Sequence, residues 1–334
     1  MSKLHPIIST LLKRIGLGII SLFFVTLIIF SSVNLLPGDF VESVLGQTRT
    51  EESVKIFRKE LGLDKPYHVR YVNWLTSAIQ GDLGSTFSGR NATYANQPQQ
   101  NTARSVSSLL KPRLFNTFFL AAMTAIIAIP LSLILGITAA LFRNSIYDRT
   151  VNASALTTIS MPEFFVAYIL IIYLASINQF FPSLSNVTSS TPFFERIYLS
   201  VLPALTLTLV TVAHMMRMTR ASIINLLSSP YIEMARLKGI SKTQVIIKHA
   251  LPNAWAPISQ VIAINLAYML IGSVVVEYVF NYQGIGRLMV GSVYNRDLPV
   301  VQACALIFAS TYVILNLIAD LIGIISNPRL LYPK

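Results

Sequence analysis

Residues 228–254 read SSPYIEMARLKGISKTQVIIKHALPNA and separate two long apolar segments of the chain. This stretch is too short and too charged to cross a bilayer, so it should lie outside the lipid. Pro230 suits the first position of a helix, Ser229 is a suitable N-cap, and Glu233 lies near the positive end of the helix dipole. Gly239 should end the helix, because glycine is common just after a helix C-terminus. The sequence therefore predicts one short helix that starts at Pro230 and ends before Gly239.

A second short helix is predicted after this corner. Ser241 and Gln244 have the spacing of a capping box, so a helix can begin at Lys242. It should end at Ala250, because Leu251-Pro252 follows and turns the chain back toward the membrane. The prediction is two short helices with a sharp corner between them, both outside the lipid.

The composition indicates a membrane protein. Of the 334 residues, 53% are hydrophobic and 12% are charged, and the mean hydropathy is +0.60. This leaves too little polar surface for a soluble globule. The net charge of +12 does not indicate nucleic-acid binding, because the basic residues lie at loop ends and are not interleaved with aromatic residues. The single cysteine, Cys304, lies in an apolar segment and excludes a disulfide framework.

Six segments are long and apolar enough to cross a membrane, so the predicted fold is an all-α membrane protein with six transmembrane helices. They are Ile15–Val33, Leu114–Phe142, Thr150–Ile177, Ile197–Ala213, Leu251–Val276 and Leu298–Ala319. The first has the basic head of a secretory signal, but no small-residue cleavage site follows it. We therefore expect an uncleaved first span with its N-terminus in the cytoplasm.

Residues 37–113 interrupt this pattern with seven acidic and ten basic side chains. The segment is too long to be a mere connector, and we expect a small extracytoplasmic domain between the first two spans. The predicted division is residues 1–36 for the N-tail and first span, then this domain, then residues 114–334 for the membrane core with the surface loop 228–254. Residues 91–102 are rich in Asn and Gln and should form a flexible loop.

The distribution of charge predicts the orientation. With six spans and a cytoplasmic N-terminus, the cytoplasmic segments are the two tails and residues 143–149 and 214–250. They hold thirteen Lys or Arg residues against two acids, Asp148 and Glu233. The positive-inside rule therefore places the loop 228–254 and both termini in the cytoplasm.

Two acids fall inside predicted spans. Glu163 follows Pro162 and interrupts the third span. Acids within a membrane are functional by default, but Glu163 near an interface would simply be solvated, and both interpretations stay open. Asp320 in the sixth span either pairs near the cytoplasmic surface or belongs to a proton relay, for which no partner is evident. Arg217 and Arg220 share a helix face, and snorkelling to the surface is the favoured interpretation.

Several chemical functions have no matching motif. The sequence contains no GxxxxGK[ST] phosphate loop, no metal-ligand cluster and no nucleophile beside a base. The chain by itself should therefore not hydrolyse ATP. A secondary transporter would need paired intramembrane ionisable residues or inverted repeats with broken helices, and neither is clear. A membrane scaffold without transport activity is the third possibility, which co-purification with an ATPase would exclude.

The loop also resembles a known pattern. Glu233-Met234-Ala235, Gly239 and Leu251-Pro252 are similar to the "EAA" loop of ABC importer permeases, although Met234 and His249 depart from it. Other stretches resemble the dipeptide, oligopeptide and nickel branch of these permeases. They are Leu61–Tyr67, Gly81–Phe87, Glu277–Phe280, Gly284–Leu288, Arg296–Gln302 and Asn316–Leu321. We read Gly284-Ile285-Gly286 as a turn, because the rest of a dinucleotide-binding motif is missing.

The resemblance implies a fold and a set of partners. The fold would be that of type I (MetI-like) ABC importers, in the inner membrane of a bacterium. The partners would be a second homologous permease, two cytoplasmic ATPases that bind ATP and magnesium, an extracytoplasmic solute-binding protein and membrane lipid. No cofactor or metal would bind this chain, and nucleic acid would not be a partner.

The resemblance also implies that the short helix docks into the ATPase. Glu233 would serve as the acid favoured by the dipole, Ala235 as a close-packing residue and Gly239 as the corner. The complete predicted set of ATPase-coupling residues is Glu233, Ala235, Arg236, Lys238, Gly239, Leu251 and Pro252. Peptides are the default substrate, and nickel, glutathione or another small solute are the alternatives. The sequence does not indicate which residues bind substrate.

Overall fold

The computed structural model describes residues 6–35, 41, 50–87, 104–241, 244, 245, 248 and 251–326. Within this part of the chain no β-strand forms, and a single β-bridge joins Ser85 and Ser105. The helices are α1 (Pro6–Asn34), α3 (Glu51–Glu60), α4 (Tyr67–Ile79), α5 (Val106–Leu141), α6 (Ile146–Ile159), α7 (Glu163–Leu170), the π-helix η4 (Ile171–Ile177), α8 (Phe193–Leu227), α9 (Pro230–Leu237), α11 (Leu251–Val279), α12 (Ile285–Tyr294) and α13 (Leu298–Ser326). The predicted flexible loop 91–102 falls outside the described residues.

Five of the described helices, α1, α5, α8, α11 and α13, are long and apolar enough to cross a membrane, and α6 with α7–η4 forms a bent pair that can be a sixth span. The all-α fold with six spans is thereby confirmed. The third span, predicted over Thr150–Ile177 with an interruption at Pro162 and Glu163, consists of α6 and α7–η4, which meet at an angle of 103°. Pro162, in extended conformation at the bend, cannot continue a helix since it lacks an N–H group.

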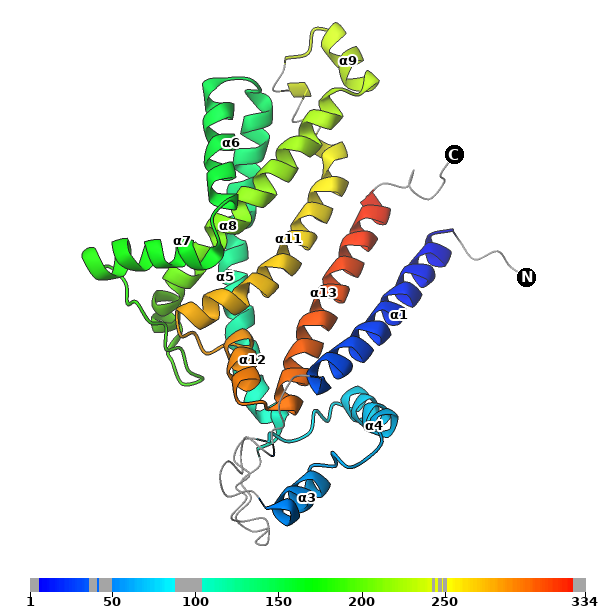
Figure 1. Cartoon of the computed structure of the whole chain (residues 1–334). Helices are drawn as coiled ribbons and strands as arrows, with labels where there is room; N and C mark the ends of the chain where they lie inside the picture. Colours follow the sequence, from blue (N-terminus) through cyan, green and yellow to red (C-terminus); the bar gives the residue numbers. More distant parts are fainter. Residues whose placement is uncertain are drawn as a thin grey trace.

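The spans lie side by side, with α1 against α13 at one edge and α6 and α7 toward the other (Figure 1). The most extensive packing joins α5 to α8. Gly136 on α5 permits this close approach, because a Cβ atom there would lie 2.8 Å from the carbonyl oxygen of Met216 and 2.9 Å from Cβ of Thr219. Small residues serve the same purpose in membrane helix pairs generally. The α5–α8 pair is therefore the most extensive helix–helix contact of the fold and is close at Gly136.

Helices α3 and α4 lie at the end of the molecule opposite α9 (Figure 1). Helix α4 packs on α1 through the ring of Phe30, whose centroid lies 5.1 Å from that of Tyr67 and 5.4 Å from that of Tyr71. The Tyr71 hydroxyl also lies 3.0 Å from Oγ1 of Thr26. Helix α4 is thus attached to the end of the first span.

A buried polar network holds the same end of the membrane core together. Glu277, fully buried, accepts hydrogen bonds from the Thr117 hydroxyl (2.6 Å) and from the backbone N–H of Arg287 (3.1 Å). Thr117 in turn accepts from the N–H of Ile285 (2.9 Å). A Cβ atom at Gly284 would lie 2.2 Å from the Glu277 carboxyl group, so glycine is required there. The network, which we call the Glu277 network, fixes the start of α12 to α5 and α11.

The turn predicted at Gly284-Ile285-Gly286 is wrong in part. Gly284 is a bend and the N-cap of α12, but Ile285 and Gly286 already belong to that helix. The helix can start there because the Glu277 carboxylate satisfies the N–H of Arg287 in its first turn, where backbone donors lack intrahelical partners.

Candidate functional site

Helix α9 is attached to the molecule by one face. Ile232 and Ala235 are 0% and 7% exposed, and they pack with Val245 and with the partly buried Leu227 and Ile240. Ala235 is therefore a close-packing residue within this chain. Leu227 is the last residue of α8, so α9 is joined to that span by both the chain and a small apolar core.

The other face of α9 is apolar and exposed. Tyr231, Met234 and Leu237 are 43%, 57% and 77% exposed, and their three-residue spacing places them on one side of the helix. We call these three residues the α9 stripe. Glu233 and Lys238 are exposed beside it. The sequence prediction selected the charged neighbours and missed the stripe, although the spacing of three apolar residues in a charged loop was the available signal.

Backbone geometry sets both ends of α9. Gly239 has a φ of 78°, in the left-handed region that favours glycine. The N–H of Ile240 reaches the carbonyl of Ala235 at 3.4 Å, which is the long hydrogen bond of a Schellman motif. The Ser229 hydroxyl donates to the carbonyl of Leu226 (2.5 Å), and among the described residues no backbone N–H of α9 donates to this hydroxyl, as its predicted N-cap role would require. The helix start therefore has no side-chain cap from Ser229.

The remaining loop residues are described in part. The N–H of Gln244 bonds to Oγ of Ser241 at 3.4 Å, as expected from the capping-box spacing. Residues 242, 243, 246, 247, 249 and 250 of the predicted second helix fall outside the described residues. Leu251 and Pro252 are the first two residues of α11. The side chains of Leu251, Pro252 and Arg236 also fall outside the description.

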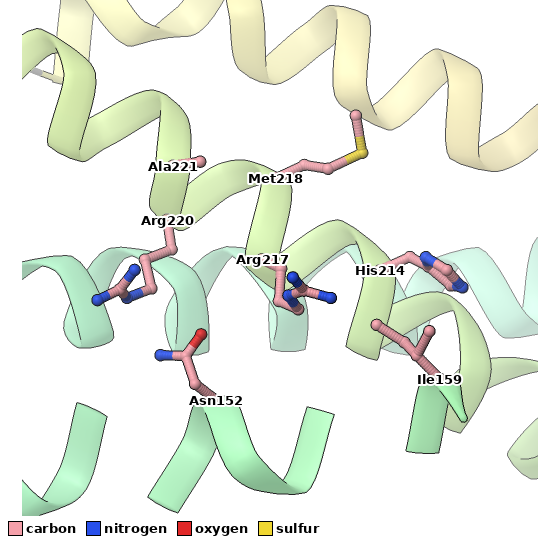
Figure 2. Close-up of a pocket in the computed structure, with 7 residues that line it drawn as sticks. All are labelled: Asn152, Ile159, His214, Arg217, Met218, Arg220 and Ala221. Atoms are coloured by element: carbon pink, nitrogen blue, oxygen red, sulfur yellow. The ribbon is translucent and has the colours of Figure 1, made fainter. Parts of the chain in front are cut away.

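A cavity of about 410 Å³ lies between α6 and α8. Figure 2 shows Arg217 and Arg220 projecting from α8 toward the side of Asn152, while Met218 projects from another side of α8. Arg220 is neutralised by Asp148, which it contacts through Nε (2.7 Å) and a terminal nitrogen (2.8 Å). Arg217 is exposed and has no ion pair with any residue in the described part of the chain. We call this space the basic cavity.

A second cavity, of about 760 Å³, lies between α7, α8 and α11, and we call it the central cavity. Its lining is mostly apolar, with Glu163 at the start of α7 as its acidic group. His214 and Met218 line both cavities, so the two adjoin. Sequence reasoning singled out Glu163 but did not find the cavity, because its walls come from three helices that are distant in the chain.

Asp320 pairs with Arg14, as one of the two interpretations predicted. The distance from Arg14 to the Asp320 carboxylate is 2.7 Å, and the pair joins α1 to α13. Among the described residues, no group of three or more His, Cys, Asp or Glu side chains is placed to hold a metal ion.

Comparison with known proteins identifies the family. Residues 132–332 match the binding-protein-dependent transport system inner membrane component, and residues 7–121 match the N-terminal region of the same kind of membrane component. The chain is 34% identical over 322 residues to the glutathione transport system permease proteins of Salmonella typhi and Salmonella typhimurium LT2. It is 33% identical to the protein of that name from Escherichia coli K12. Each alignment covers 96% of this chain and 98% of the relative. The chain therefore belongs to the family of inner-membrane permease subunits of binding-protein-dependent ABC importers.

Proposed function

We propose that this permease subunit forms half of the translocation path for a peptide-class solute, and that glutathione is the first solute to test. The observation that carries the proposal is the end-to-end similarity to proteins named as glutathione permeases, which covers 98% of their length. Glutathione is itself a tripeptide with an amino group and carboxylates. The peptide default and the glutathione alternative therefore describe one chemical class, and the names of the relatives favour it over nickel.

Energy for transport enters through partner subunits in this proposal. Two cytoplasmic ATPases bind ATP and magnesium, and α9 docks on them. A second homologous permease forms the other half of the translocation path. The exposed α9 stripe supports this docking, since exposed apolar surface in a charged loop is typical of an interaction site. Both termini lie in the cytoplasm with α9. In support, α1 begins and α13 ends toward the end of the molecule that carries α9 (Figure 1).

The packing of α9 suggests how its movement reaches the membrane. Ile232 and Ala235 pack against Leu227 at the end of α8, so a displaced α9 pulls on α8. Helix α8 is held closely to α5 at Gly136. The two spans should then move together as a rigid body, which is one of the usual forms of a transport transition.

The test is uptake by the complete transporter in cells that lack other peptide and glutathione importers. Radiolabelled glutathione, a dipeptide, an oligopeptide and a nickel salt are supplied, and the partner binding protein is assayed with each. We expect uptake of glutathione or another peptide, and its loss when the ATPase phosphate-loop lysine is replaced. Uptake that continues with inactive ATPases, or a binding protein that takes nickel and none of the peptides, would overturn the proposal.

A further inference from the structure

Glu163 is an acid of the third span with no hydrogen-bond or ion-pair partner in the described part of the chain. It begins α7 at the 103° bend of the third span, where its partly buried side chain lines the central cavity. No hydrogen bond or ion pair joins its carboxylate to a described residue. An ionised carboxylate has about four acceptor sites. These sites are therefore free to receive a donor that enters the cavity.

A glycine on the neighbouring span makes room for this carboxylate. A Cβ atom at Gly272 of α11 would lie 2.7 Å from Oε1 and 3.1 Å from Oε2 of Glu163. The acid thus rests against the bare backbone of α11. The contact with Gly272 is a packing contact, and the carboxylate oxygens accept no hydrogen bond from a described residue.

Two other acids of the membrane core, Asp148 and Glu277, have hydrogen-bond donors beside their carboxylates. Asp148, 3% exposed, receives two hydrogen bonds from Arg220, and Glu277, fully buried, receives bonds from Thr117 and Arg287. Buried carboxylates without such partners are costly. An acid in a mostly apolar cavity that lacks them has the arrangement expected of a site completed by a cationic ligand.

The two adjoining cavities have opposite charge. Glu163 lines the central cavity, and Arg217 lines the basic cavity. His214 lines both cavities. Along α8 the lining residues run from Leu207 to Arg217, which is about 15 Å of helix at the usual rise of about 1.5 Å per residue. An extended tripeptide spans at most about 11 Å. The two cavities together therefore have room along α8 for a zwitterionic tripeptide, with Glu163 as the acidic group of one cavity and Arg217 as a basic group of the other.

We propose that Glu163 is a substrate-recognition residue, whose carboxylate binds the protonated amino group of the solute in the cavity between α7, α8 and α11. This inference rests on the proposed function, since it requires a solute that carries an amino group. The permease would then select its cargo in addition to the selection made by the binding protein. The competing role is an ion pair between Glu163 and a basic residue of the second permease subunit.

The experiment compares two solutes in the intact transporter, reconstituted with its binding protein, second permease and ATPases. The solutes are the transported peptide and its des-amino analogue, supplied at concentrations that saturate the binding protein. Uptake is measured for the parent chain, E163Q, E163D and the control E195Q, whose exposed carboxylate lies in the first turn of α8. Because the binding protein is constant, a change in the ratio of the two uptake rates reports on the permease.

We expect E163Q to lower uptake of the amino-bearing peptide at least about tenfold, as for the loss of one charge-assisted hydrogen bond. Uptake of the des-amino analogue should change less than twofold, E163D should be intermediate, and E195Q should match the parent chain. G272A, which should displace the carboxylate, provides a second variant with the same selective loss if E163Q assembles poorly. Assembly is checked by co-purification of all subunits.

Equal losses for both solutes would overturn the inference and indicate an ion pair with the second permease or a structural role. Unchanged uptake of both would overturn it as well. A parent transporter that takes up no amino-bearing peptide would contradict the proposed function itself, and with it the inference. The parent and variant measurements therefore separate the two failures.

Discussion

Polar groups in two regions of the membrane core differ in whether they have partners. At the end near α4, the Glu277 network joins α5, α11 and α12 through buried hydrogen bonds, and the buried Arg196 donates to Asn116 and to the carbonyl of Thr188 (2.8 Å). The α9 stripe, at the opposite end, is exposed, and the cavities between α6, α7, α8 and α11 hold Glu163 and Arg217 without hydrogen-bond or ion-pair partners among the described residues. Satisfied polar groups fix a structure. Unsatisfied ones are available to ligands and partner subunits.

The strongest test of this contrast is E277A. The variant leaves the Thr117 hydroxyl and the N–H of Arg287 buried without their acceptor, and each unsatisfied group costs about 1–3 kcal/mol. We expect a loss of about 2–5 kcal/mol of stability, measured as a lower melting temperature of the purified complex in detergent and less protein in the membrane. E163A is the matched control and should melt like the parent chain. Similar melting of the two variants would remove the distinction.

G239V tests whether α9 transmits movement. Valine is strained at a φ of 78°, so the corner after α9 should change its direction. We expect uptake to fall about tenfold or more while ATP hydrolysis by the complex continues, because the docked helix no longer holds α8 correctly. G81V is the control, since Gly81 also has a positive φ (84°) but lies in the loop after α4. Full transport by G239V would contradict the coupling role.

A smaller effect is expected from L237D. The side chain is 77% exposed, so the substitution should change the free energy of unfolding of the isolated permease by no more than about 0.5 kcal/mol. It places a charge on the α9 stripe, which a docked partner would bury. The measured result should be a several-fold loss of ATPase in co-purification. I56D is the control: it changes an exposed aliphatic side chain on α3 (40% exposed) in the same way. This variant should co-purify with as much ATPase as the parent chain. Equal retention by both variants would exclude the stripe as the docking face.

The smallest effect is expected from D320N. The Arg14–Asp320 pair is solvent-accessible, with side chains 48% and 29% exposed, and such pairs contribute about 0–1 kcal/mol. The melting temperature should fall by a few degrees at most, and less in high salt, because mobile ions screen exposed charges. Uptake should stay within twofold of the parent chain. A strong loss of uptake with normal assembly would revive the proton-relay interpretation.

Much of the fold was predictable because the bilayer restricts what a chain can do. Long uncharged segments must form helices, and five predicted spans correspond to α1, α5, α8, α11 and α13. The interruption of the third span was also predictable, because Pro162 is a local signal for a break. Its angle depends on how α7 packs on α8 and α11, which local sequence does not contain.

The loop 228–254 also combines locally determined features with features that depend on tertiary contacts. The positions of α9 and Gly239 follow from proline, glycine and charge, which act locally. The roles of Ser229 and Ala235 depended on neighbours, since a hydroxyl can accept or donate and an alanine can face either way. In the folded chain Ser229 donates to Leu226, and Ala235 faces the small core with Val245.

The sequence by itself determined the class of protein, the number of apolar segments and the family, because hydropathy and short motifs are local properties. The tertiary structure decided which polar groups are paired and which are free. Glu277 and Glu163 are both acids in apolar surroundings, yet the first lies among donors from α5 and α12, and the second faces a cavity beside Gly272. Pairing is a matter of distance between helices that are far apart in the chain, and folding sets that distance.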